Sequence, residues 1–114
     1  HRIQKLDRDL RFVKAWGRPA TSLRNPAPDE LYGPRVFALD TDANLLVADT
    51  GNKRVLKFDR DGRHLATYGR PGSAPGEFDE PVGLAVAPNG DVYVGDFWNR
   101  RVQRFDRGGL PGQP

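Results

Sequence analysis

The stretch VADTGNKRVLKFD at residues 47–59 recurs as VGDFWNRRVQRFD at residues 94–106, which is 47 residues further along the chain. A third, partial copy opens the chain, where HRIQKLD at residues 1–7 aligns with residues 53–59. Similarity at a fixed period of roughly 20 to 50 residues is typical of repeat proteins. The fold is therefore predicted from one repeated unit.

Each period holds four short, strand-like runs separated by turn residues. In the complete copy these runs cover residues 36–39, 45–48, 54–58 and 64–68, and Asp-Gly or Asn-Gly pairs supply the positive φ that tight hairpins need. Four antiparallel strands in such a period describe a propeller blade. We predict an all-β fold of β-propeller blades, in which the third run lies nearer the outside because its middle residue is the charged Lys57.

The alignment of the copies divides the chain into four segments. These are the second half of one blade with an inserted connector (1–32), a complete blade and connector (33–80), three strands of a further blade (81–107) and a Gly/Pro-rich tail (108–114). Five extra, proline-rich residues between Gly17 and Pro34 are predicted to form a loop. About two blades make an incomplete ring, so either further blades of a longer protein or self-association must close it, and we favour the longer protein.

Several spaced motifs resemble a known family. They are Gly-Leu-Ala-Val at 83–86, Asn-Gly-Asp-Val-Tyr-Val at 89–94, Asp-Thr-Gly-Asn-Lys-Arg-Val at 49–55 and Gly-Glu-Phe at 76–78. Together they resemble the NHL repeat, and the resemblance extends to Asp106. It implies a propeller of the six-bladed type. The repeats also resemble propellers appended to bacterial membrane proteins of the glycosyltransferase type.

The composition excludes some chemistry and leaves the cellular compartment open. The 114 residues include no cysteine, so disulfides, thiolate metal sites and a cysteine nucleophile are excluded. The 15 acidic residues are interspersed with 18 basic ones, and the net charge of +3 implies no strong overall field. No run approaches the roughly 18 apolar residues of a membrane span.

Neither a metal nor a cofactor is expected. Zinc-dependent lyases of similar fold use several histidines, whereas this chain has only His1 and His64, which are predicted to be exposed polar positions. The glycines of residues 69–76 alternate with prolines that lack the backbone donors of a phosphate loop. This stretch is predicted to be a connector between blades.

One polar set recurs in both copies. Its members are Asp49, Asn52 and Arg54 in one copy and Asp96, Asn99 and Arg101 in the next. Catalytic groups seldom repeat in every blade, whereas scaffold groups must. We therefore interpret the set as a structural ladder that ties the second strand of each blade to the third.

The two copies differ most in one loop, where Phe97 and Trp98 replace Thr50 and Gly51. Exposed aromatics beside basic residues are usual anchors of a contact surface. The basic residues predicted to share this face are Lys53, Arg100, Arg70 and Arg18. Equally open is a loop that folds its Trp onto a neighbouring blade. By contrast, Trp16 and Tyr68 are predicted to lie in the core.

The leading functional hypothesis is a non-catalytic scaffold that binds a protein or another polymer. The first alternative is single-stranded RNA binding through a basic loop face, which requires affinity that falls steeply with salt. The second is a larger propeller enzyme whose active residues lie outside this segment. A fold alone does not choose among these.

Overall fold

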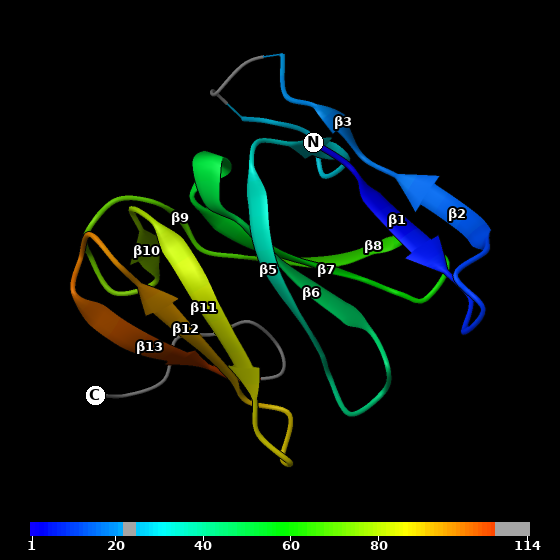
Figure 1. The fold of residues 1–114 in the computed structure, drawn as a ribbon. Coiled ribbons are helices and arrows are strands. Elements are labelled where there is room, and N and C mark those ends of the chain that lie inside the picture. Colours follow the sequence, from blue (N-terminus) through cyan, green and yellow to red (C-terminus); the bar gives the residue numbers. More distant parts are fainter. Residues whose placement is uncertain (22–24, 107–114) are drawn as a thin grey trace.

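The computed structural model describes residues 1–21 and 25–106, whose main strands form three successive antiparallel sheets (Figure 1). The first sheet pairs β1 (Ile3–Leu6) with β2 (Phe12–Trp16). The second has the order β5 (Pro34–Leu39), β6 (Leu45–Asp49), β7 (Arg54–Phe58), β8 (His64–Tyr68). The third has the order β11 (Pro81–Val86), β12 (Val92–Asp96), β13 (Arg101–Phe105). The predicted all-β fold and its four-stranded antiparallel sheet are confirmed.

Turn chemistry explains why each hairpin closes where it does. Gly62 closes β7 to β8 at φ 87°, and Gly90 closes β11 to β12 at φ 94°. Ala43 takes the corresponding place between β5 and β6 at φ 63°, although a side chain disfavours this left-handed conformation. At its hairpin, the carboxylate of Asp40 accepts hydrogen bonds from the backbone N–H groups of Asp42 and Asn44. The polar side chain thus holds a turn that lacks glycine.

The core lies in two clusters, one on each face of the second sheet. Val47, Leu56 and Phe58 pack with Ile3 of the first sheet. On the opposite face, the cluster consists of Leu46, Val55, Tyr68, Phe78, Val92, Val94 and Phe105. The strand β7 is the third of its sheet, as the sequence predicts. Because both faces of the sheet are covered, its residues are mostly buried.

Among the described residues, the face of the third sheet that points away from the second sheet is not covered by another sheet. Val55 is fully buried, whereas its counterpart Val102 is 69% exposed. Tyr93 is likewise exposed where Leu46 is buried. The described residues close no ring. Completion of the ring by further blades or by a second copy stays a prediction, and the mass of the chain in solution tests whether copies associate.

The connectors contain more structure than the sequence indicates. The predicted loop between Gly17 and Pro34 includes β3 (Arg18–Pro19) and β4 (Glu30–Leu31), which pair in parallel. The next connector includes β9 (Arg70–Pro71) and β10 (Glu77–Phe78), paired in the same way. The sequence analysis did not predict these short pairs, which form because the apolar residues that end β4 and β10 are fully buried and fix the segments against the sheets.

The sequence did contain a signal for these pairs. Ala27-Pro28-Asp29-Glu30-Leu31 corresponds to Ala74-Pro75-Gly76-Glu77-Phe78 at the spacing of the main repeat. The connector is therefore part of the repeated unit, and the five extra residues fall between Pro19 and Ala27. The predicted tail, residues 108–114, lies outside the described residues.

Candidate functional site

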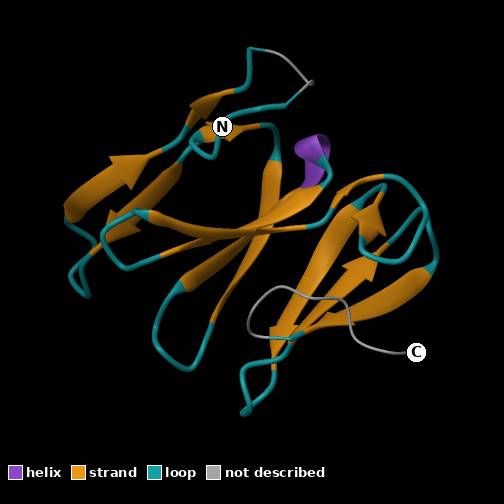
Figure 2. Cartoon of the chain, turned by 180° about the vertical axis from the view of Figure 1, so that it is seen from behind, coloured by secondary structure: helices purple, strands orange, loops and turns teal. Residues whose placement is uncertain are grey.

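The candidate site is the loop that follows β12, residues 97–100, called the aromatic loop below. Its backbone closes when the N–H of Arg100 donates to the carbonyl of Phe97 at 3.1 Å. The N–H of Lys53 makes the equivalent bond to Thr50 at 3.1 Å, across the short 3₁₀ turn η1 (Thr50–Asn52) seen in Figure 2. Arg100 and Lys53 both take a left-handed conformation, at φ 54° and 58°. The same turn is thus built twice with different side chains.

Both aromatic side chains of this loop are exposed. Phe97 is 61% exposed and Trp98 is 60% exposed, and their rings meet edge to face at 5.2 Å between centroids. Exposed large aromatics that support one another are suited to contact another molecule. Among the described residues Trp98 is therefore exposed, and its packing onto a further blade stays a prediction.

The two aromatic residues occupy positions with different surroundings. In the earlier copy, the hydroxyl of Thr50 donates to the carbonyl of Pro81 at 2.7 Å, in the first strand of the following sheet. Phe97 occupies the equivalent position in a sheet with no successor among the described residues. Trp98 aligns with Gly51, which lies beneath Tyr32. The residue equivalent to Phe97 thus contacts the following repeat, and the residue equivalent to Trp98 contacts the connector that precedes its own sheet.

Trp98 forms part of a pocket of about 360 Å³ between the second and third repeats, called the inter-repeat pocket below. One repeat contributes Tyr32, Arg35, Gly51 and Lys53 to its lining, and the next contributes Asp79, Glu80 and Trp98. The sequence analysis did not predict this pocket, because the position equivalent to Tyr32 in the next copy holds Asp79 and the copies therefore share no aromatic residue there. The Gly-to-Trp exchange in the loop was the available signal.

Three of the four predicted basic residues are paired with carboxylates. Lys53 forms an ion pair with Asp79. Arg70 donates through Nε to Glu77 Oε2 at 2.9 Å. Arg70 also lines a separate pocket of about 600 Å³, so the basic residues do not gather around a single pocket.

The third pair lies in the first connector. Arg18 donates through Nε to Asp29 Oδ2 at 2.9 Å, and this hydrogen bond holds the pKa of Asp29 below its ordinary value. Hydrogen bonds from the backbone N–H of Ala74 and from Arg70 likewise lower the pKa of Glu77. Arg100 alone among these basic residues forms no ion pair within the described part of the chain.

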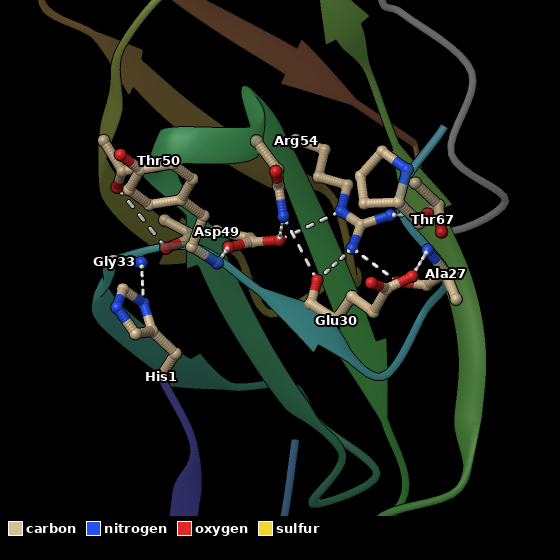
Figure 3. A network of polar contacts seen from close by, with 12 residues as sticks. His1, Ala27, Glu30, Gly33, Asp49, Thr50, Arg54 and Thr67 are labelled. Atoms are coloured by element: carbon tan, nitrogen blue, oxygen red, sulfur yellow. Dashed lines mark hydrogen bonds and ion pairs between the residues drawn. The ribbon is translucent and has the colours of Figure 1, made fainter. Parts of the chain in front are cut away.

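The polar ladder begins at Asp49, whose carboxylate is fully buried (Figure 3). Its Oδ2 accepts from Arg54 Nε at 3.0 Å and from Asn52 Nδ2 at 2.8 Å. Its Oδ1 accepts from the backbone N–H of Tyr32 at 2.8 Å. A buried carboxylate requires this full set of partners.

Arg54 extends the ladder to the connector. Its Nη1 donates to the carbonyl of Pro26 at 2.8 Å, and its Nη2 donates to the carbonyls of Ala27 at 2.8 Å and Glu30 at 2.7 Å. The planar guanidinium suits such divergent acceptors. The ladder therefore holds the connector onto its blade, in addition to joining β6 to β7.

The second copy of the ladder is built differently. Asp96 accepts hydrogen bonds from the backbone N–H groups of Asp79 and Glu80, and from Asn99. Arg101 donates through Nη2 to carbonyls of the connector, but the described residues include no hydrogen bond between Asp96 and Arg101. The predicted tie between the second and third strands is thus direct in one copy only, and in the other both groups contact the connector separately.

Other predicted positions differ in burial. Tyr68 is buried as expected, whereas Trp16 is only half-buried. His1 is exposed, yet its Nδ1 accepts from the backbone N–H of Gly33 at 2.9 Å and its ring meets Tyr32 edge to face. His64 is half-buried and contacts Phe58, contrary to the expected exposure, because it faces the aromatic core at the end of β7.

The carboxylate of Glu30 accepts several hydrogen bonds within the first connector. Backbone N–H groups of Ala27 and Thr21 and the hydroxyl of Thr21 all donate to it, which lowers its pKa to about 2. Glu77 repeats the contact to Ala74. The carboxylate therefore closes the connector turn in its ionised form.

This pKa predicts a pH dependence of stability. The unfolded carboxyl has the ordinary pKa of 4.5, so it binds more protons than the folded one below that pH. The contribution of Glu30 is complete above pH 4.5 and is lost as the pH falls towards 2. We expect the free energy of unfolding to fall more steeply over this window in the wild type than in Glu30→Gln, as measured by urea denaturation at stepped pH. Parallel curves for the two proteins would contradict this role.

Within residues 1–21 and 25–106, no group of three or more His, Cys, Asp or Glu side chains is placed to hold a metal ion. The same residues contain no helix that is long and apolar enough to cross a membrane.

The four-stranded sheet, the three-stranded sheet that repeats its first three strands, the shared loop geometry and the connector contacts together define blades of a β-propeller. Residues 78–105, from β10 through β13, match the family model of the NHL repeat, so the chain carries an NHL repeat. The structurally equivalent segment one period earlier, residues 31–58, runs from β4 through β7. No curated protein shows a significant match to the chain.

Proposed function

We propose that this chain is a non-catalytic scaffold that binds a protein partner through the aromatic loop. The observation that carries the proposal is the exposure of Trp98 beside the inter-repeat pocket, at a position where the preceding repeat has glycine. An exposed Trp next to a concave surface is a typical binding anchor. NHL repeats form propellers suited to protein interaction, and the match at residues 78–105 supports this class of function.

The pairing of the basic residues favours a protein over RNA. Lys53, Arg70 and Arg18 each face a carboxylate, so the loop face has little uncompensated positive charge. Binding of single-stranded RNA depends on cations that neutralise phosphates, and its affinity falls steeply with salt. We therefore rank RNA second, and salt-sensitive binding to poly-uridine would reverse that order.

The repeated carboxylates support a scaffold rather than an enzyme. Asp49 and Asp96 are both engaged by hydrogen bonds from the connector or from neighbouring side chains. Groups held in this way stabilise the blade and are poorly placed to exchange protons with a substrate. Turnover by a longer propeller that contains this segment would contradict the proposal.

The test uses a variant that the chain itself suggests. Phe97→Thr combined with Trp98→Gly gives the aromatic loop the residues of the preceding repeat. Because both side chains are exposed, we expect its free energy of unfolding to change by no more than about 0.5 kcal/mol. Peptides selected from a displayed random library on the wild type should bind the variant at least about tenfold more weakly, since interface anchors contribute more than about 1 kcal/mol each.

The matched control is Phe12→Ala, which removes an exposed aromatic from β2. The selected peptides should bind this control as tightly as the wild type, as measured by titration calorimetry. Peptides that bind all three proteins equally, or a selection that yields no binder, would contradict a site at the aromatic loop.

A further inference from the structure

The inter-repeat pocket is lined by two aromatic residues, which come from different repeats and from different places within the repeat. Tyr32 belongs to the connector of one repeat, and Trp98 belongs to the loop of the next. At the connector position one repeat has Tyr32 and the next has Asp79. At the loop position the first has Gly51 and the next has Trp98. Each repeat thus has one large and one small residue at this pair of positions, in opposite order.

The exchange has a steric reason. A Cβ atom on Gly51 would lie 2.5 Å from the backbone carbonyl oxygen of Tyr32 and 2.7 Å from Cδ1 of its ring, so a side chain there conflicts with both. The next repeat has no ring at this position, because Asp79 replaces Tyr32, and its loop contacts the connector differently. There the N–H of Phe97 donates to the carbonyl of Glu80 at 3.0 Å, whereas in the earlier repeat the N–H of Gly51 donates to the carbonyl of Tyr32 at 2.8 Å. The consequence is that Tyr32 and Trp98, 45% and 60% exposed, both line one pocket.

The charged residues of the pocket compensate one another. Lys53 pairs with Asp79, and Arg35 Nη1 lies 3.7 Å from Glu80 Oε1. A charged ligand would have to compete with these pairs, whereas an uncharged one leaves them intact. The pocket therefore favours a ligand without charge.

The pocket also retains hydrogen-bond donors. The hydroxyl of Tyr32 and the indole N–H of Trp98 form no hydrogen bond within the described part of the chain. Both groups are donors on the edges of exposed aromatic rings. Exposed aromatics that supply donors to backbone carbonyls are the means by which proline-rich segments are recognised, since their polyproline II backbone has no internal hydrogen bonds.

We propose that the inter-repeat pocket binds an uncharged, proline-rich peptide in the polyproline II conformation. Proline rings pack against Tyr32 and Trp98, and the two donors bond to peptide carbonyls. The volume of about 360 Å³ is within the range of ligand-binding pockets, which begins at roughly 300 Å³. This inference rests on the proposed function and names the chemistry of its partner.

The test titrates the full chain with decaproline capped at both ends. Binding is followed by NMR through the indole N–H of Trp98, which is assigned by its absence in Trp98→Gly. We expect saturable binding, weakened at least about tenfold by Trp98→Gly and by Tyr32→Ala, as for interface anchors that contribute more than about 1 kcal/mol. Tyr32→Phe keeps the ring and should give a smaller loss. For the variants, the peptide is followed by its own capped-end fluorophore.

Two comparisons make the result specific. Phe12→Ala should bind decaproline as the wild type does, and affinity should be unchanged between about 50 mM and about 500 mM salt, because no charge is involved. Urea denaturation establishes that each variant is folded. No saturable binding, or binding that both Trp98→Gly and Tyr32→Ala leave intact, would overturn the proposal.

The same measurements separate this inference from the proposed function. If decaproline fails while library-selected peptides still require the aromatic loop, the scaffold function holds and the proline-rich class is wrong. If the library also yields no binder that depends on Phe97 and Trp98, both are wrong.

Discussion

Replacement of Arg54 by alanine is expected to lower the free energy of unfolding by about 3–5 kcal/mol, the usual cost of removing one partner from a buried ion pair. Asp49 is fully buried and would keep only the neutral donors of Asn52 and Tyr32. The carbonyl of Pro26 would lose its donor, whereas Ala27 keeps the backbone N–H of Glu30 and Glu30 keeps the amide of Asn52. The first connector should therefore be held less tightly to its blade.

The matched control for this prediction is Arg101→Ala, at the equivalent position of the next repeat. Arg101 is half-buried and has no hydrogen bond to Asp96 within the described residues, so only its bonds to Ala74 and Glu77 are lost. We expect a loss of about 1–3 kcal/mol. Urea denaturation followed by tryptophan fluorescence measures both values. An equal loss for the two variants would show that the buried pair with Asp49 has no special weight.

The contrast between these two arginines shows how far sequence could take the fold. The repeat predicted the strands, the sheet order and the identity of the ladder residues, because identical spacing imposes the same backbone. It could not predict that Asp49 bonds directly to Arg54 while Asp96 does not bond to Arg101. That difference depends on which connector atoms reach each pair, and the two connectors differ in length and in the residues that flank the shared motif.

The candidate site was predictable in part for the same reason. Comparison of the copies identified Phe97 and Trp98 as the residues that depart from the repeat, and both are exposed. The pocket beside them was not predictable from either copy alone. It depends on Tyr32, which is 66 residues away from Trp98 in the sequence and lies across the junction of two repeats. Side chains that meet only through repeat stacking leave no local pattern.

The connectors show a further limit. Short runs with proline indicate loops, and β3 and β9 each consist of an Arg-Pro pair. Their parallel partners are held by buried Leu31 and Phe78, so tertiary packing decides a structure that local sequence preference does not. The same packing makes the glycine before β9 a sensitive position.

Gly69→Ala is expected to lower the free energy of unfolding by about 2–5 kcal/mol. Gly69 has φ 78°, a conformation that costs a residue with a side chain about 1–2 kcal/mol. A Cβ atom there would also lie 2.2 Å from Cε2 of Phe78, which is fully buried and meets Phe105 at 5.5 Å between ring centroids. Displacing a core ring adds a cost of about 1–3 kcal/mol. Gly17 shows the same conflict with Leu31 in the first connector, so both connectors require glycine at this point.

Gly33→Ala separates the two contributions. Gly33 has φ 63°, but no atom lies within 4 Å of the Cβ that alanine would add. This variant should lose only the conformational share, about 1–2 kcal/mol, in the same urea denaturation experiment. The difference between Gly69→Ala and Gly33→Ala then measures how tightly the connector packs against the third sheet. If the two losses are equal, the connector can shift away from Phe78, and the junction between these blades is looser than the buried ring indicates.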